Sequence, residues 1–226
     1  MLKFCRRSRD FILDILFPIE CLNCRQEGAY LCPNCLAKLK FNDETYLKTA
    51  LANLKISDLK KIYIAGDYES SILHNLIIKY KYSFISPLGK ILADFLILFW
   101  KKISPIFTSD ATPFLVIPIP LSKKRERWRG FNQAEVISRN FSVYFNYELN
   151  LDLKRIKHRP PQAELSEIER LKNIESVFAW QGKNLQAYHI LLIDDVVTSG
   201  ATLNEAARVL KAAGAKNVYA LVLAKG

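Results

Sequence analysis

The sequence has no apolar run long enough to cross a membrane. Its strongest candidate, residues 91–100, is interrupted by Asp94 and falls well short of the roughly 18 apolar residues that a span requires. The helical spacing of its apolar residues predicts a buried amphipathic helix instead. A basic stretch at residues 6–9 precedes a short apolar run, but Asp14 interrupts that run and no small-residue cleavage site follows. We therefore expect a cytoplasmic protein with no membrane span.

The two glycine-rich phosphate motifs G-x-x-x-x-G-K-[ST] and G-x-G-x-x-G are also absent, as are internal repeats and low-complexity segments. The three histidines, His74, His158 and His189, are scattered, and none stands out as a general base. Acidic residues are scarce relative to basic ones: 22 Asp and Glu against 33 Lys and Arg give a net charge of +11. This excess does not indicate a fold. It favours anionic partners such as nucleic acid, phosphorylated metabolites or an acidic membrane surface.

Four of the five cysteines form two closely spaced pairs, Cys21 with Cys24 and Cys32 with Cys35. Each pair can supply two thiolates from one tight turn, and the two turns together complete a tetrahedral zinc site. Two disulfides or free thiols are the alternatives, but a bridge within such a short turn is strained and disulfides are rare in the cytosol. We expect structural Zn²⁺, with Cys5 as a lone thiol. The polar stretch 40–45 then ends a zinc-finger module over residues 1–45.

Strand-like and helix-like stretches alternate through residues 46–226, the pattern of an α/β domain. Prolines at 118 and 120 end one strand, and the last strand, helix and strand predict a right-handed parallel crossover. We expect strands at 62–65, 114–117, 149–153, 190–193 and 218–223, and helices at 71–80, 91–100, 132–145 and 202–213.

The junction after residue 193 combines two acids with a small, hydroxylated loop. Asp194 and Asp195 follow a buried strand, at the edge where open α/β sheets bind ligands. The next residues lead into a helix N-terminus, whose N–H groups and positive dipole end form an anion site. A plain capped turn explains the hydroxyls but not the adjacent acids. The junction can therefore hold a sugar phosphate, with carboxylates on two ribose hydroxyls and the phosphate on Thr198, Ser199, Gly200, Ala201 and Thr202.

Residues 190–202 resemble the phosphoribosyl-pyrophosphate signature of type I phosphoribosyltransferases: four apolar residues, two acids, two more apolar residues, then T-S-G-A-T. The wider chain resembles the ComF (ComFC) family, which is associated with bacterial competence and DNA uptake. In that family a four-cysteine zinc finger precedes a phosphoribosyltransferase-like domain. Two residues depart from the pattern, Ser199 where threonine is usual and Tyr82 where a small residue is expected. The resemblance is carried by the four cysteines, by residues 116–121 and 129–134, and by Gln162, Arg170, Asn173 and Phe178.

The resemblance implies a type I phosphoribosyltransferase-like parallel sheet flanked by helices over residues 46–226. It implies that the two acids hold the ribose diol of phosphoribosyl pyrophosphate, that residues 198–202 bind its 5′-phosphate, and that Mg²⁺ bridges ligand oxygens. Leu121 and Ser122 would occupy the pyrophosphate-loop position. Residues 159–173 would form a mobile hood, whose Arg170 is either a pyrophosphate ligand or a solvated helix residue.

The densest cationic run encloses an indole and comprises Lys123, Lys124, Arg125, Arg127, Trp128 and Arg129. Such cations neutralise phosphates, and Trp128 can stack on an unpaired base, which fits single strands better than duplex. A solvated loop with Trp128 folded onto the core, or a pyrophosphate clamp, explains the run equally well. The resemblance favours single-stranded DNA.

Two functions follow. One is a competence-type protein that handles single-stranded DNA during natural transformation, beside proteins of the DNA-uptake machinery, with a domain that binds phosphoribosyl pyrophosphate. The other is an active phosphoribosyltransferase of nucleotide metabolism or salvage, a pentosyl-transferring enzyme whose finger only stabilises it. Neither an acceptor pocket nor a catalytic base can be identified in the sequence.

Overall fold

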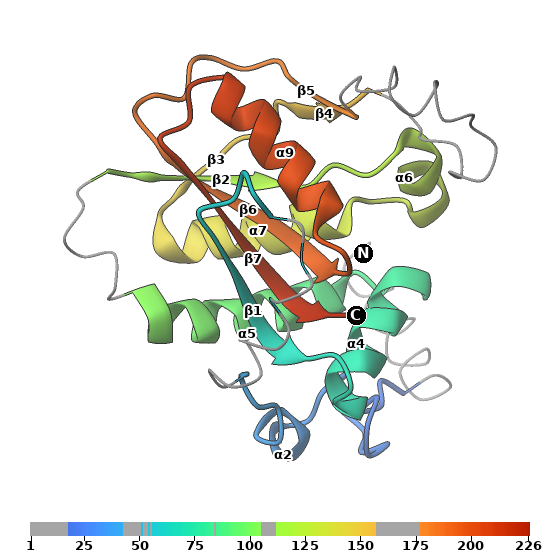
Figure 1. The fold of residues 1–226 in the computed structure, drawn as a ribbon. Coiled ribbons are helices and arrows are strands. Elements are labelled where there is room, and N and C mark those ends of the chain that lie inside the picture. Colours follow the sequence, from blue (N-terminus) through green and yellow to red (C-terminus); the bar gives the residue numbers. More distant parts are fainter. Residues whose placement is uncertain are drawn as a thin grey trace, which may run out of the picture.

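A parallel sheet of five strands forms the centre of the computed structural model, which describes residues 18–42, 51, 54, 56–83, 85–104, 112–156 and 177–226. All of its strand pairings are parallel, as the family resemblance implied (Figure 1). The strand order is β1–β7–β6–β2–β3. The bounds are β1 (Lys61–Asp67), β2 (Phe114–Pro118), β3 (Glu148–Leu149), β6 (His189–Val197) and β7 (Asn217–Lys225).

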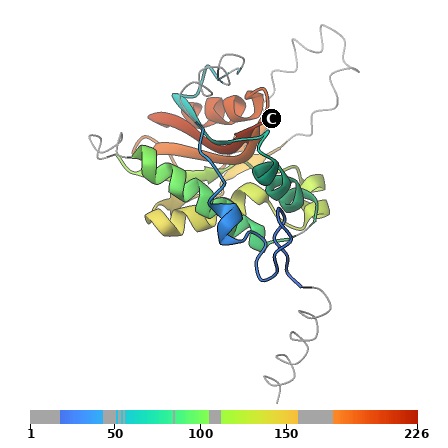
Figure 2. The same ribbon diagram turned by 90° about the horizontal axis from the view of Figure 1, so that it is seen from below.

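The longer strands send alternate side chains into two hydrophobic layers on opposite faces of the sheet. On β6, Leu191 and Ile193 enter one layer, and Ile190 and Leu192 enter the other. Three helices cover the first face, α4 (Ser71–Tyr82), α5 (Pro87–Ile103) and α7 (Gln133–Phe145), while α9 (Ala201–Ala212) covers the second (Figure 2). Burial on both faces explains why the central strands are nearly continuous apolar runs.

The helix expected at 91–100 is the middle of α5, and most of its apolar side chains are buried against the sheet. Among the described residues, none of the helices has the length and apolar character needed to cross a bilayer. At α7, Asn132 caps the helix: its Oδ1 accepts from the main-chain N–H of Ala134 at 3.1 Å.

The strand predicted over residues 149–153 is wrong as a single element. Glu148 and Leu149 add to the main sheet as β3, whereas β4 (Leu153–Arg155) pairs antiparallel with β5 (Phe178–Trp180) in a separate two-stranded sheet. The break lies at Asn150, whose Oδ1 accepts from the main-chain N–H of Asp152 at 2.6 Å. This local side-chain turn redirects the chain from one sheet to the other.

The N-terminal cysteine module is docked onto the rest of the fold. It contains the short helix α2 (Pro33–Leu36), and beyond it Phe41 forms an antiparallel bridge to Gly66 of β1. The Phe41 ring lies 5.1 Å from the ring of Phe95 in α5, centroid to centroid. The main-chain N–H of Asn42 donates to the carbonyl of Ala65 at 2.9 Å. The segment that leaves the module thus continues the edge of the main sheet.

Candidate functional site

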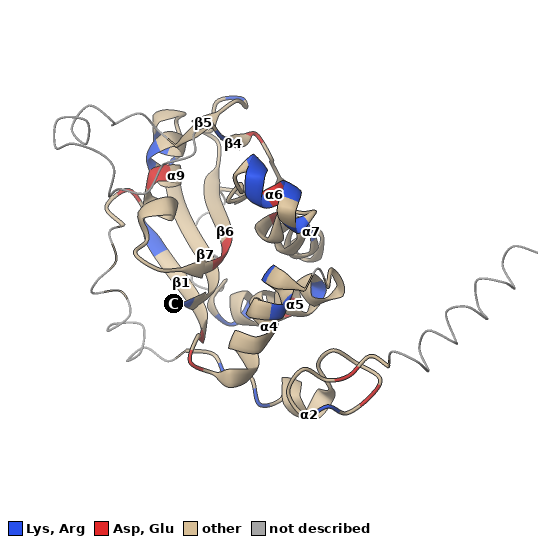
Figure 3. Cartoon of the chain, turned by 90° about the vertical axis from the view of Figure 1, so that its right-hand side faces the viewer, with Lys and Arg blue, Asp and Glu red and all other residues tan. Residues whose placement is uncertain are grey.

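The two adjacent acids lie within β6, near its carboxyl end. The strand runs on to Val197 instead of ending before Asp194, as the sequence had suggested. The main-chain N–H of Asp195 donates to Asp194 Oδ1 at 2.8 Å. Because β6 is the middle strand of the sheet, between β2 and β7, the acids occupy the central position at the edge where open α/β sheets bind ligands. Figure 3 shows this acidic end of β6 in red, between α6 and α4.

The loop between β6 and α9 has the form expected of an anion cradle. Thr198 and Ser199 are exposed, and the helix begins directly after Gly200. Gly200 has φ +79°, a left-handed conformation that side-chain-bearing residues rarely adopt. Together with Asp194, the residues from Val196 to Leu203 line a cavity of about 40 Å³. The first N–H groups of a helix have no acceptor within it, so this cavity can hold an anion.

A lysine from another helix binds the acid pair. Lys81 Nζ, near the end of α4, lies 2.9 Å from Asp195 Oδ1, and the two side chains are only 16% and 12% exposed. The sequence had left this lysine without a role. The contact exists because β1 and β6 are parallel, so the helix that follows β1 reaches the same edge of the sheet as the acids.

The acid pair has unusual electrostatics. Burial and the negative charge of Asp195 raise the pKa of Asp194 to about 8, and the positive charges of Lys81 and Arg155 act in the opposite direction. Arg155 belongs to β4, far from both the acids and Lys81 in the sequence. Cations from two separate segments therefore offset the repulsion between neighbouring carboxylates.

A larger groove of about 850 Å³ opens beside the acids, along the residues that follow β2. The register pairs Pro118 of β2 with Ile193 of β6, so the two sites share one edge of the sheet. The groove contains Leu121 and Ser122, the predicted pyrophosphate-loop residues. Its basic lining residues come from the predicted run and from the separate strand β4: Lys123, Lys124, Arg127, Lys154 and Arg155.

The basic run forms a helix, α6 (Lys123–Arg129), and not the surface loop considered from the sequence. Ser122 caps it by accepting from the main-chain N–H of Arg125 at 3.3 Å, and Gly130 ends it in a left-handed conformation. Most of its basic side chains are exposed, but Arg129 is buried and donates to Gln133 Oε1 at 2.9 Å. Trp128 is 56% exposed and is not folded into the core.

Several predicted residues lie outside the part of the chain that the structure describes. They include Arg170 and the rest of the segment 159–173, together with Cys5. Lys81, Lys154 and Arg155 are the site residues that sequence reasoning missed. Their only sequence signal was positive charge near the end of an expected element, and that signal is common on surfaces.

The four cysteines of the N-terminal module converge as predicted. Their Sγ atoms all lie within 4.8 Å of one another, and Cys24 Sγ is 3.5 Å from Cys32 Sγ. Four sulfurs around one Zn²⁺ at about 2.3 Å would be about 3.8 Å apart, so the cluster can hold a metal ion such as zinc. Burial acts to raise the pKa of Cys21, but main-chain N–H donors of Cys32, Cys24 and Asn23 lower it to about 6. Such donors favour the thiolate form that binds metal.

Residues 129–226 match the family model described as the phosphoribosyl transferase domain. This range covers the end of α6, α7, all the later strands and the β6–α9 loop. The acid pair and the anion cradle thus lie within the matched domain, while Leu121, Ser122 and most of α6 precede it.

Curated relatives match over similar lengths. Competence protein F of Haemophilus influenzae is 36% identical over 116 residues, which cover 50% of this chain and 51% of that protein. Competence protein ComFC of Bacillus subtilis is 39% identical over 97 residues, 43% of this chain and 38% of the relative. The DNA utilization protein YhgH of Escherichia coli O157:H7 is 30% identical over 114 residues, 50% of each chain. The alignments thus span about half or less of these relatives.

Proposed function

We propose that this chain is a competence-type protein of the ComF family that binds phosphoribosyl pyrophosphate and handles single-stranded DNA. The observation that carries the proposal is the β6–α9 junction, where two acids precede an anion cradle beside a basic groove. The relatives' names add competence and DNA utilization as the setting. Proteins of the DNA-uptake machinery are the partners expected in that setting.

The phosphoribosyl donor has a sugar diol between two phosphate-bearing positions. Asp194 and Asp195 would accept hydrogen bonds from the two ribose hydroxyls, while residues 198–202 bind the 5′-phosphate. The pyrophosphate would extend into the groove toward Ser122 and Lys123, which lie on the same edge of the sheet. Oxygen ligands of this kind suit Mg²⁺, which typically uses one or two carboxylates plus substrate phosphates and keeps several waters. Mg²⁺ would neutralise the donor's phosphates there.

Calorimetric titration with phosphoribosyl pyrophosphate and Mg²⁺ tests donor binding. We expect saturable binding that weakens by about 10- to 150-fold in Asp195→Asn, since a charged hydrogen bond contributes roughly 1.5–3 kcal/mol. Asp94→Asn is the matched control, because this carboxylate is about half exposed on α5, away from the sheet edge. Equal effects of the two substitutions, or no binding by the wild type, would contradict the assignment.

Contact of α6 with the sugar-phosphate backbone predicts a salt-dependent affinity for single strands. Each phosphate neutralised contributes about −0.7 to the slope of log K against log salt concentration. Lys123→Ala with Arg127→Ala should therefore make the slope shallower by about 1.4. Lys101→Ala with Lys102→Ala removes the same charge from the exposed end of α5 and should leave the slope unchanged. Similar slopes in all three proteins would contradict DNA binding through α6.

An active phosphoribosyltransferase is the second candidate. It is favoured by the size of the groove and by its apolar lining at Leu151, Leu153 and Ile156, which could admit an acceptor base beside the ribose. Pyrophosphate release in the presence of candidate bases, abolished by Asp195→Ala, would establish transfer. Its absence with every base tested, alongside intact donor binding, would leave the binding function alone.

We also propose that the cysteine cluster holds one structural Zn²⁺. Three of its cysteines are buried within the hydrophobic layer that includes α5, so the ion would join this module to the main fold. Zinc supplies no chemistry to the donor site in this proposal.

A further inference from the structure

Two aromatic side chains from different helices meet at the surface. Tyr82 is the last residue of α4 and is 52% exposed; Trp128 belongs to α6 and is 56% exposed. Their ring centroids are 5.9 Å apart with an interplanar angle of 62°. In such an edge-to-face pair each ring keeps at least one face clear of the other. Their exposed fractions show that both rings contribute apolar surface to solvent.

The pair is held in place by its neighbours in the sequence. Lys81, directly before Tyr82, is bound to Asp195 at 2.9 Å. Arg129, directly after Trp128, is buried, and its guanidinium lies 5.5 Å from the centroid of the Tyr82 ring. Tyr82 therefore follows a side chain that is held by an ion pair, and Trp128 precedes one that is held by a hydrogen bond. The Lys81–Asp195 ion pair thus ties the end of α4 that carries Tyr82 to the candidate donor site.

The surroundings match the chemistry of an unpaired nucleotide. Lys124 and Arg125 precede Trp128 by four and three residues, which brings them to neighbouring positions on the helix surface, and both are exposed. Flat rings with cations one helical turn away can stack a base and neutralise the adjacent phosphates, as single-strand-binding surfaces do. A pair that served only to seal the contact between α4 and α6 would not require exposed rings flanked by cations.

We propose that Tyr82 and Trp128 together form a stacking site for an unpaired nucleobase, adjacent to Asp195. The inference rests on the proposed binding of single-stranded DNA and specifies where a base of the strand is held. A free acceptor base has the same flat surface and is the other possible source of the ligand. In either case the base is held beside the site assigned to the phosphoribosyl donor.

The experiment compares two probes of equal charge, an oligothymidylate and an abasic oligomer of the same length. Trp128→Leu and Tyr82→Leu keep apolar side chains at the contact but remove one ring. We expect each to weaken oligothymidylate binding on the order of 5- to 150-fold, the effect of losing one stacked base. Binding of the abasic oligomer and the salt slope should stay unchanged, and Trp128→Phe should restore much of the affinity.

Tyr144→Leu is the matched control. Tyr144 is 51% exposed on α7, and Lys101 Nζ lies 4.9 Å from its ring centroid, so it offers a similar exposed ring beside a cation in another place. This variant should bind both oligomers like the wild type. Thermal melts of all variants show whether the fold is intact.

The outcomes separate this inference from the proposed function. Equal weakening for both oligomers in Trp128→Leu, or no weakening for either, overturns the stacking site while DNA binding stands. If the wild type binds neither oligomer, the proposed DNA function fails. Titration with free nucleobases then decides: quenching of tryptophan fluorescence that is lost in Trp128→Leu supports a site for a free base, and no such quenching overturns the inference as well.

Discussion

Two ion pairs of almost equal length allow the contribution of the buried Lys81–Asp195 pair to the stability of the protein to be tested. Lys81 Nζ lies 2.9 Å from Asp195 Oδ1, with side chains 16% and 12% exposed. Lys90 Nζ lies 3.0 Å from Asp94 Oδ2, with side chains 71% and 50% exposed. The substitutions Lys81→Met and Lys90→Met remove the same charge from contacts that differ mainly in burial.

The expected costs differ by about tenfold. Two unit charges 2.9 Å apart attract by about 6 kcal/mol at an effective dielectric constant of 20, but by less than about 2 kcal/mol in water. Removing one partner of a buried pair typically costs about 3–5 kcal/mol, because a charge is left without compensation. An exposed pair four residues apart on a helix contributes only about 0.3–0.5 kcal/mol. We therefore expect a large loss for Lys81→Met and almost none for Lys90→Met.

Urea unfolding followed by circular dichroism measures both losses, and the pH dependence adds a second readout. Lys81 lowers the pKa of Asp194, so the pKa of this carboxyl should rise further in Lys81→Met. A carboxyl with a raised pKa in the folded state destabilises the protein as pH increases toward that pKa. The loss in Lys81→Met should therefore shrink as pH falls. Similar losses for both variants, or a loss that does not vary with pH, would refute the reasoning.

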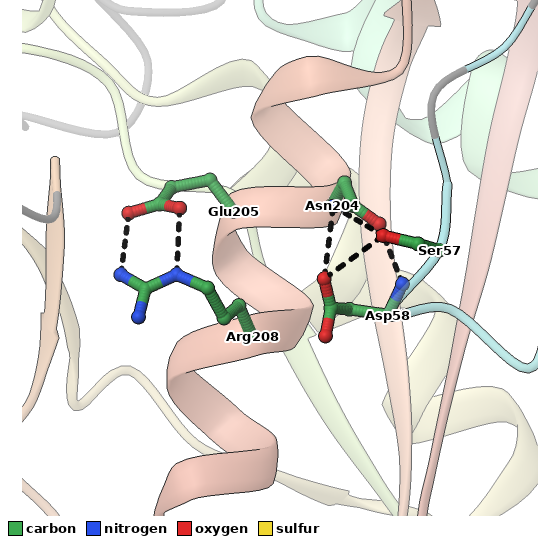
Figure 4. A network of polar contacts seen from close by, with 5 residues as sticks. All are labelled: Ser57, Asp58, Asn204, Glu205 and Arg208. Atoms are coloured by element: carbon green, nitrogen blue, oxygen red, sulfur yellow. Dashed lines mark hydrogen bonds and ion pairs between the residues drawn. The ribbon is translucent and has the colours of Figure 1, made fainter. Parts of the chain in front are cut away.

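Three further predictions concern the metal cluster, the acid pair and the attachment of α9. Metal analysis should find one zinc per chain in the wild type and none in Cys35→Ser, and the variant should also melt at a lower temperature. Wild-type protein that was purified without chelator and contains no zinc would contradict this. Burial raises the pKa of Asp194 from 3.8 to about 8, so this carboxyl makes the free energy of unfolding fall as pH rises between those values. A phosphoribosyl donor that binds the ionised form of Asp194 should bind more tightly as pH rises to about 8, and calorimetry across pH can check this trend. Asn204→Ala should lower the free energy of unfolding in urea by about 1–3 kcal/mol, because Asn204 Oδ1 accepts from the main-chain N–H of Asp58 at 2.7 Å and its Nδ2 donates to Asp58 Oδ2 at 3.0 Å (Figure 4). The control Arg208→Ala breaks an exposed ion pair with Glu205 on the same helix and should cost less than about 0.5 kcal/mol.

The sequence predicted the part of the fold from β6 to β7 most accurately because its local signals agree with one another. β6 and β7 are continuous apolar runs, and α9 has buried residues at helical spacing. α6 was not expected, although Ser122 and Gly130 are ordinary start and stop signals. Its residues are almost all charged, so it has no apolar periodicity. The residues that cap its two ends are therefore the main sequence signal for this helix.

The candidate site could be read from the sequence where its residues are contiguous, and its residues were missed where they are not. Asp194 and Asp195 and the loop after them form one segment, so their chemistry can be read along the chain. Lys81 and Arg155 reach the acids only because a helix and a strand from other parts of the chain end at the same sheet edge. That convergence is a property of topology, and charge alone gives no distance between residues far apart in the sequence.

The arrangement of charge at this edge argues for a ligand with two different ends. A basic groove by itself would attract any phosphate, and the +11 net charge strengthens that attraction without selecting a ligand. The acids offer acceptors for hydroxyl groups, whereas phosphate oxygens need donors or cations, so anions should bind on either side of the acids and not over them. A ligand that places hydroxyls at Asp194 and Asp195, and phosphates at Gly200 and Ser122, meets both conditions. Phosphoribosyl pyrophosphate has that distribution of groups, whereas a plain phosphate chain does not, and this difference supports the donor assignment for the acid pair.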